Sequence, residues 1–117
     1  MRVIEFYKTE TGKSPVEDFL ISLPSKVRQK AVWVLKAIEQ LQRISSQYFK
    51  KLDGTDDIWE IRIIHGKDSV RLLCFWCGDN LIIATNGFKK KTDKVPQKEI
   101  QLAEDRKREF ERRKRNG

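Results

Sequence analysis

Histidine, cysteine and long apolar segments are scarce in this sequence, and each scarcity excludes a class of protein. There is one histidine among 117 residues, and there are two cysteines, too few for a zinc site built from paired cysteines and histidines. The longest apolar run, residues 72–77, is far shorter than the ~20 residues that a membrane helix needs. The opening stretch MRVIEFYKTETGK has no long apolar region and no small-residue cleavage site, so no signal peptide is expected. We therefore expect a cytoplasmic protein that does not contact a membrane.

The cysteines and the clustered aspartates do not predict a metal or redox site. Cys74 and Cys77 lie three residues apart on an expected strand, where they point to opposite faces and neither converge on a metal nor pair easily. Asp53, Asp56 and Asp57 lie among turn residues, without the set of oxygen ligands that binds Mg²⁺. We expect reduced core thiols, no metal and no cofactor.

Positive charge is abundant. Lysine and arginine number 25 against 17 acidic residues, a net charge of +8, which favours a polyanionic partner over the alternative that the charge serves solubility alone. The length predicts a single domain over residues 1–117. Its basic C-terminal end, from about residue 111, is expected to fray.

The order of hydrophobic patterns predicts an α+β fold. Ser14 and Pro15 mark a strong helix start, and a longer helix with a regular apolar stripe is expected from Pro24 to about residue 41. Strands are expected over 3–7, 58–64, 70–76 and 81–85, and residues 86–87 are expected to end the last of them. A loop is expected over 45–55 and a last helix over 97 to about 113. The predicted order is β-α-α-β-β-β-α, with helices covering one face of an antiparallel sheet.

The strand pair around residues 59–75 places two arginines opposite each other. A turn at residues 65–68, or a tighter two-residue loop at 66–67, gives the same pairing, with Ile61 opposite Leu72 on an apolar face and Arg62 opposite Arg71 on the other. Like charges directly across a strand pair cost up to roughly 1 kcal/mol. Either an RNA phosphate lies between the guanidinium groups, or Glu60 on the same face bridges one of them in a solvated charge cluster.

The next strand adds candidate RNA contacts to the arginine face. Arg71 is expected opposite Asn86 or Phe88, and Phe88 either stacks on a base at the end of the sheet or belongs to the core. Lysines concentrate at the same edge, either as a polyanion site or as a solvated face. The predicted RNA-binding set is Lys50, Lys51, Phe88, Lys89 and Lys91.

Motifs along nearly the whole chain resemble those of a known family. SPVEDFL and KLDGTDDIWE precede the strand pair, followed by WEIR, SVRLLCF, NGFKKKTDKVP and EIQLAEDR. Their order and spacing resemble the HigB/RelE-like toxins of bacterial and phage toxin–antitoxin modules, in the branch that carries G-F-x-K-K-T near a proline and then E-I-x-x-A-x-x-R.

This resemblance implies a RelE-like, microbial-ribonuclease-type fold and a toxin that enters the ribosomal A site and cuts the messenger RNA being decoded. It also implies a cognate helix-turn-helix (HigA-like) antitoxin. The family's functional positions correspond to Arg62 and Arg71 and, less directly, to the basic patch 89–91. Many relatives place a histidine where this chain has Asn86. If that histidine carries a proton in the relatives, this chain must use another residue or cleave RNA less efficiently.

Cleavage by the ribose 2′-hydroxyl needs a base, an acid and stabilisation of the phosphorane charge. Arg62 and Arg71 suit the electrostatic task. Lys90 is the preferred base because it shares the face of Arg71 and neighbouring cations disfavour its charged form. His65 is either an acid or base or an exposed turn residue. The alternatives are a non-catalytic DNA gyrase inhibitor of the ParE type and an RNA- or ribosome-binding module.

Overall fold

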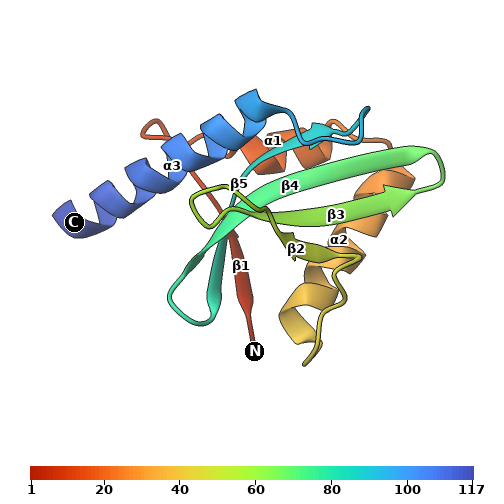
Figure 1. Cartoon of the computed structure of the whole chain (residues 1–117), viewed down its shortest axis with the longest axis horizontal. Helices are drawn as coiled ribbons and strands as arrows, with labels where there is room; N and C mark the ends of the chain where they lie inside the picture. The colour runs from red at the N-terminus through yellow and green to blue at the C-terminus, as the bar shows by residue number, and fades with distance from the viewer.

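The computed structural model describes residues 1–117 and confirms the α+β class (Figure 1). The elements are β1 (Val3–Phe6), α1 (Pro15–Ile21), α2 (Ser25–Gln40), β2 (Phe49–Lys51), β3 (Trp59–His65), β4 (Asp68–Cys77), β5 (Leu81–Lys89) and α3 (Gln97–Asn116). The five strands form one sheet in the order β1-β5-β4-β3-β2. None of the helices is long and apolar enough to span a membrane.

Two features of the sheet differ from the prediction. β1 runs parallel to β5, so the sheet is mixed and not wholly antiparallel. The predicted loop over 45–55 contains β2, which pairs antiparallel with β3. Tertiary packing specifies this short strand, because the Phe49 ring is buried and stacks on Trp59 with ring centroids 4.7 Å apart. Three residues carry too little periodicity to predict a strand.

The predicted register of β3 and β4 is confirmed. Arg62 pairs with Arg71, and His65 pairs with Asp68, which identifies the tighter two-residue loop as the correct one. Gly66 in that loop has a φ of 59°, a conformation that glycine adopts without strain. The register therefore places both arginines on one face of the sheet.

β5 is longer than predicted and contains a bulge. Leu73 pairs with Asn86 and Cys74 pairs with Ala84, so one extra residue of β5 lies between these pairs. The predicted strand end at 86–87 is wrong, because the ladder resumes after the bulge and continues to Lys89. Phe88 consequently lies opposite Arg71.

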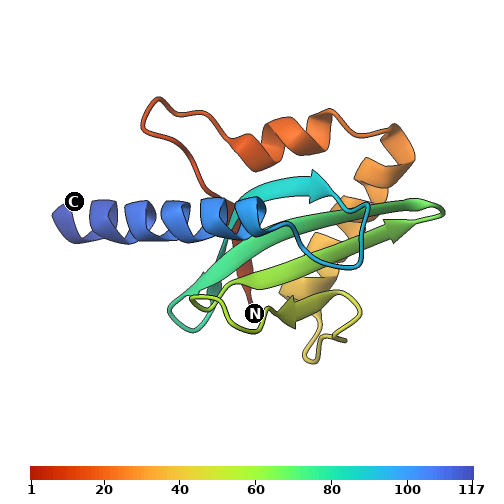
Figure 2. The same ribbon diagram turned by 45° about the horizontal axis from the view of Figure 1, so that its top comes forward.

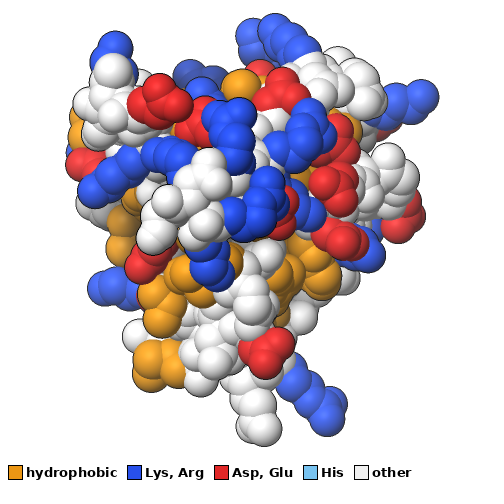
Figure 3. Space-filling model, turned by 90° about the vertical axis from the view of Figure 1, so that its left-hand side faces the viewer, with side chains coloured by type: hydrophobic (Ala, Val, Ile, Leu, Met, Phe, Trp, Pro, Cys, Tyr) orange, Lys and Arg blue, Asp and Glu red, His pale blue; other side chains and the backbone are white.

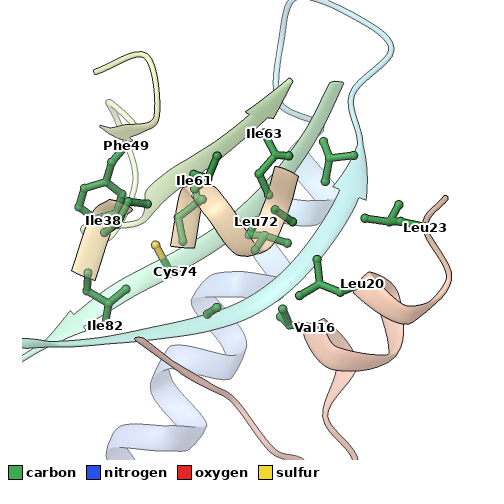
Figure 4. Packing of buried hydrophobic residues seen from close by; sticks show 14 of the residues in the cluster. Val16, Leu20, Leu23, Ile38, Phe49, Ile61, Ile63, Leu72, Cys74 and Ile82 are labelled. Atoms are coloured by element: carbon green, nitrogen blue, oxygen red, sulfur yellow. The ribbon is translucent and has the colours of Figure 1, made fainter. Parts of the chain in front are cut away.

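The first core layer lies between the sheet and the helices α1 and α2 (Figure 4). Val27, Ala31, Val34 and Ile38 of α2 are buried at helical spacing, as the apolar stripe predicts. Burial raises the pKa of the Cys74 thiol above its ordinary value, and both cysteines are free. Cys74 is therefore an inert core thiol.

The second core layer lies under α3, which crosses the opposite face of the sheet (Figure 2). The prediction that helices cover one face is therefore wrong. The apolar stripe of α3 is hard to recognise because Lys107 occupies one of its buried positions. Its amine reaches the Asp56 carbonyl at 2.7 Å while its stem is buried. The side chains of this layer are Tyr7, Ile58, Leu73, Phe75, Ile83, Phe88 and Ala103.

Candidate functional site

Arg62 and Arg71 share one carboxylate on the α3 side of the sheet. Arg71 Nε lies 3.1 Å from Glu60 Oε2, and Arg62 Nε lies 3.6 Å from Glu60 Oε1. Glu60 therefore bridges both guanidinium groups, whereas the sequence-based alternative assigned it to one. A negative charge between two positive ones relieves the cross-strand repulsion that the register alone would create.

The two arginines differ in exposure. The Arg71 side chain is 3% exposed and that of Glu60 is 4% exposed, whereas the Arg62 side chain is 29% exposed. Arg71 also donates through Nη1 to Ser69 Oγ at 2.9 Å and to the Val70 carbonyl at 3.2 Å. Burial lowers the pKa of Arg71; the Glu60 charge opposes this shift and the Arg62 charge adds to it. An arginine remains charged nonetheless, so Arg71 is a buried ion and Arg62 is the accessible cation.

Hydrogen bonding within this arginine–glutamate cluster (Glu60, Arg62 and Arg71) is incomplete. Glu60 Oε2, Arg62 Nε and Arg71 Nε are three of the five buried side-chain atoms without a hydrogen-bond partner. The 3.1 Å approach of Arg71 to Glu60 is an ionic contact without hydrogen-bond alignment. Charge attraction, and not a set of aligned hydrogen bonds, therefore holds these three side chains together.

The two lysines of β2, Lys50 and Lys51, lie on different faces of the sheet. Lys50 pairs with Glu60 across β2 and β3, so it shares the arginine face. Lys51 pairs with Trp59 on the other face and forms an ion pair with Asp57 at 2.9 Å. That contact lowers the pKa of the Asp57 carboxyl. Of these two lysines, only Lys50 joins the arginines.

The predicted base, Lys90, continues the β5 ladder beyond the strand end. Its backbone N–H donates to the Ser69 carbonyl at 2.8 Å, which places Lys90 beside the serine that binds Arg71. The side chains of Lys89 and Lys91 are exposed. Sequence reasoning missed Ser69, although its position two residues before Arg71 on the same strand face was a usable signal.

Phe88 and His65 are not presented to the cluster in the way that RNA contacts would require. Phe88 is 8% exposed and belongs to the core layer under α3, which fits the core alternative and not a stacking platform. His65 is exposed at the end of β3, and strand alternation puts it on the face opposite Arg62.

Asn86, at the position where many similar toxins have a histidine, connects two elements of this chain. It is 3% exposed, and its amide donates to the Glu99 carbonyl at 3.2 Å and to Glu99 Oε1 at 3.0 Å. Its amide oxygen accepts from Thr85 Oγ1 at 2.6 Å. These bonds join β5 to the first turn of α3, so the Asn86 side chain stabilises the contact between these two elements.

The C-terminal end of α3 carries charges of both signs. In Figure 3, which views the molecule from that end, Lys and Arg side chains lie beside Asp and Glu side chains. Arg113 binds Glu109 at 2.8 Å, and Arg108 binds Asp105. Two basic residues of this end are therefore neutralised, whereas Arg112, Lys114 and Arg115 form no ion pair.

Comparison with known proteins identifies a family. The family described as phage-derived protein Gp49-like (DUF891) matches residues 18–108. No curated protein matches the chain. The matched range includes the arginine–glutamate cluster and the lysines that follow β5. The chain therefore belongs to the phage-derived Gp49-like family.

Proposed function

We propose that this chain is the toxin of a toxin–antitoxin module, of the HigB type, and that it cleaves translated messenger RNA on the ribosome. One observation carries the proposal within this family. Arg62 projects 29% exposed from the sheet, while the buried Glu60 and Arg71 fix its position. A preorganised cation on a rigid strand is suited to hold a phosphate.

The chemistry follows from this placement. The ribose 2′-oxygen attacks the adjacent phosphorus, its proton passes to a base, and the 5′-oxygen leaves with a proton, giving a 2′,3′-cyclic phosphate. Arg62 stabilises the charge that develops on the phosphorane oxygens, and Lys90 is our candidate for proton transfer. Few acid–base groups suffice when the ribosome positions the substrate, because positioning alone supplies several kcal/mol.

A helix-turn-helix antitoxin of the HigA type is the protein partner that we propose, and the cytoplasm, where ribosomes are found, is the proposed compartment. Co-expression of the chain with a helix-turn-helix protein encoded beside it tests the partnership. Co-purification as a stable complex and relief of growth arrest would support it. Failure of both would remove the antitoxin from the proposal without bearing on cleavage.

A purified translation system with a defined messenger tests the nuclease. We expect primer extension to show new RNA ends inside translated codons, only when ribosomes are present, and to show their loss with Arg62→Ala. Arg112→Ala is the matched control, since Arg112 is exposed on α3 and its loss changes the net charge equally. Intact messenger with the wild-type protein would refute the proposal and direct attention to a DNA supercoiling assay for a gyrase inhibitor.

Binding to RNA or the ribosome without cleavage is the second candidate. It is favoured by the position of His65, since the single histidine lies on the face opposite Arg62. Ribosome association that inhibits translation and leaves the messenger intact would identify this activity.

A further inference from the structure

A small hollow lies at the end of the sheet where three segments meet. These are the corner between α1 and α2, the β3–β4 hairpin and the residues that follow β5, which lie at the same end of the molecule (Figures 1 and 2). The hollow has a volume of about 170 Å³. Its Ser69 also accepts the hydrogen bond from Arg71, so this serine connects the rim of the hollow to the arginine–glutamate cluster on the other face of the sheet.

The floor of the hollow is apolar and firmly held. Leu23, Val27 and Val70 line it, and each is at most 3% exposed because it belongs to the first core layer. A hollow of this size suits the planar ring system of a single nucleobase, with the sugar and phosphate lying outside it.

The rim of the hollow is strongly basic. Lys67, Lys89, Lys90 and Lys91 line it, and none of them forms an ion pair with a carboxylate of the chain. The first turn of α2 has neither a side-chain cap nor an acidic residue, which adds positive potential at the same place. An apolar floor inside a ring of unpaired cations fits a nucleobase whose flanking phosphates contact the lysines.

One acidic residue interrupts the basic rim. Asp68 lines the hollow and forms no ion pair either. A carboxylate only accepts hydrogen bonds, so it pairs with the exocyclic amino group of cytosine, adenine or guanine. At the same position, uracil presents a carbonyl oxygen, which a carboxylate repels.

We propose that this hollow binds one unpaired RNA base that bears an exocyclic amino group, and that Asp68 selects such a base over uracil. The inference rests on the proposed function in that it requires single-stranded RNA as a ligand. It adds a base-reading subsite at the end of the sheet, across the sheet edge at Ser69 from the arginine–glutamate cluster.

Fluorescence anisotropy with labelled oligocytidylate and oligouridylate of equal length tests the subsite. We expect the wild-type protein to bind oligocytidylate about tenfold more tightly, since a good base contact contributes ~1–3 kcal/mol. Asp68→Asn should reduce that ratio towards one, because an amide can donate to the uracil carbonyl. Asp79→Asn, in the exposed turn between β4 and β5, removes the same charge and should keep the ratio.

The outcomes separate the subsite from the nuclease. A wild-type ratio near one, an unchanged ratio in Asp68→Asn or no binding of either oligonucleotide would overturn the subsite, even if messenger is cut in the translation system. A cytosine preference that depends on Asp68, without messenger cleavage, would support the subsite and refute the nuclease.

Discussion

Removal of Arg71 and removal of Arg62 should have unequal effects on folding, although the two residues pair directly in the sheet. Arg71→Met leaves the Glu60 carboxylate, 4% exposed, with a single cation 3.6 Å away. Breaking a buried ion pair from one side costs ~3–5 kcal/mol, and the remaining arginine places the expected loss near the lower end, at about 3 kcal/mol. Arg62→Met removes a partly exposed contact that solvent screens, so its expected cost is at most about 1 kcal/mol.

Urea unfolding followed by tryptophan fluorescence measures both effects. Trp59 and Trp76 are partly buried against the first core layer, so their emission should report its loss. With a slope of ~1–3 kcal/mol per molar urea, Arg71→Met should lower the midpoint by about 1–3 M, and Arg62→Met by a third of that or less.

A second variant keeps the reasoning testable if Arg71→Met fails to fold. Glu60→Gln combined with Arg71→Met removes both buried charges and should recover most of the lost stability, since the penalty comes from an uncompensated charge. Equal midpoints for the two single variants, or a double variant as unstable as Arg71→Met, would refute the assignment of Arg71 as a buried structural ion.

Three further predictions concern the two core layers. Gly87→Ala should cost ~1–3 kcal/mol in urea unfolding, because an added Cβ would lie 2.5 Å from the Phe19 ring; an unchanged midpoint would contradict this close packing. Lys107→Met should cost ~1–2 kcal/mol, since it removes the 2.7 Å bond from Nζ to a loop carbonyl, whereas the control Lys98→Met, exposed on α3, should change little. Burial and then a hydrogen bond to α3 raise the pKa of Tyr7 above 10.0. The protonated Tyr7 hydroxyl therefore contributes fully to the free energy of unfolding below pH ~10, and this contribution is lost as the pH rises through the folded-state pKa. The stability advantage of wild type over Tyr7→Phe should therefore shrink in alkaline unfolding titrations, and a constant difference would count against it.

Local signals were sufficient for the hairpin and for the first two helices. The alternation of apolar residues and the turn residues between β3 and β4 specify one register, which the structure adopts. Ser14 and Pro15 lie at the start of α1 as predicted, although the Ser14 side chain makes no capping hydrogen bond. These features are determined by residues that are close together in the sequence, so local sequence patterns are enough to predict them.

The features that were missed depend on contacts distant in sequence. The stacking of Phe49 on Trp59 stabilises β2. These two residues are distant in sequence, so the local pattern around β2 does not predict the strand. The placement of α3 was obscured because a buried position of its core-facing side is occupied by a lysine, Lys107. Strand parity placed Arg62 and Arg71 correctly, but it could not show that only Arg71 is covered, since burial is decided by the whole tertiary arrangement.

The distribution of paired and unpaired cations bears more directly on function than the net charge of +8 does. At the C-terminal end of α3, acidic neighbours partly neutralise the basic side chains (Figure 3). At the end of the sheet, Lys67 and the lysines at 89–91 have no such partners. An approaching polyanion is attracted most strongly to the unpaired cations, because a neighbouring carboxylate cancels much of the field of a paired one. The unpaired lysines therefore attract RNA to the end of the molecule where Arg62 is exposed, while Arg112, Lys114 and Arg115, which form no ion pair either, provide a second attraction at the α3 terminus.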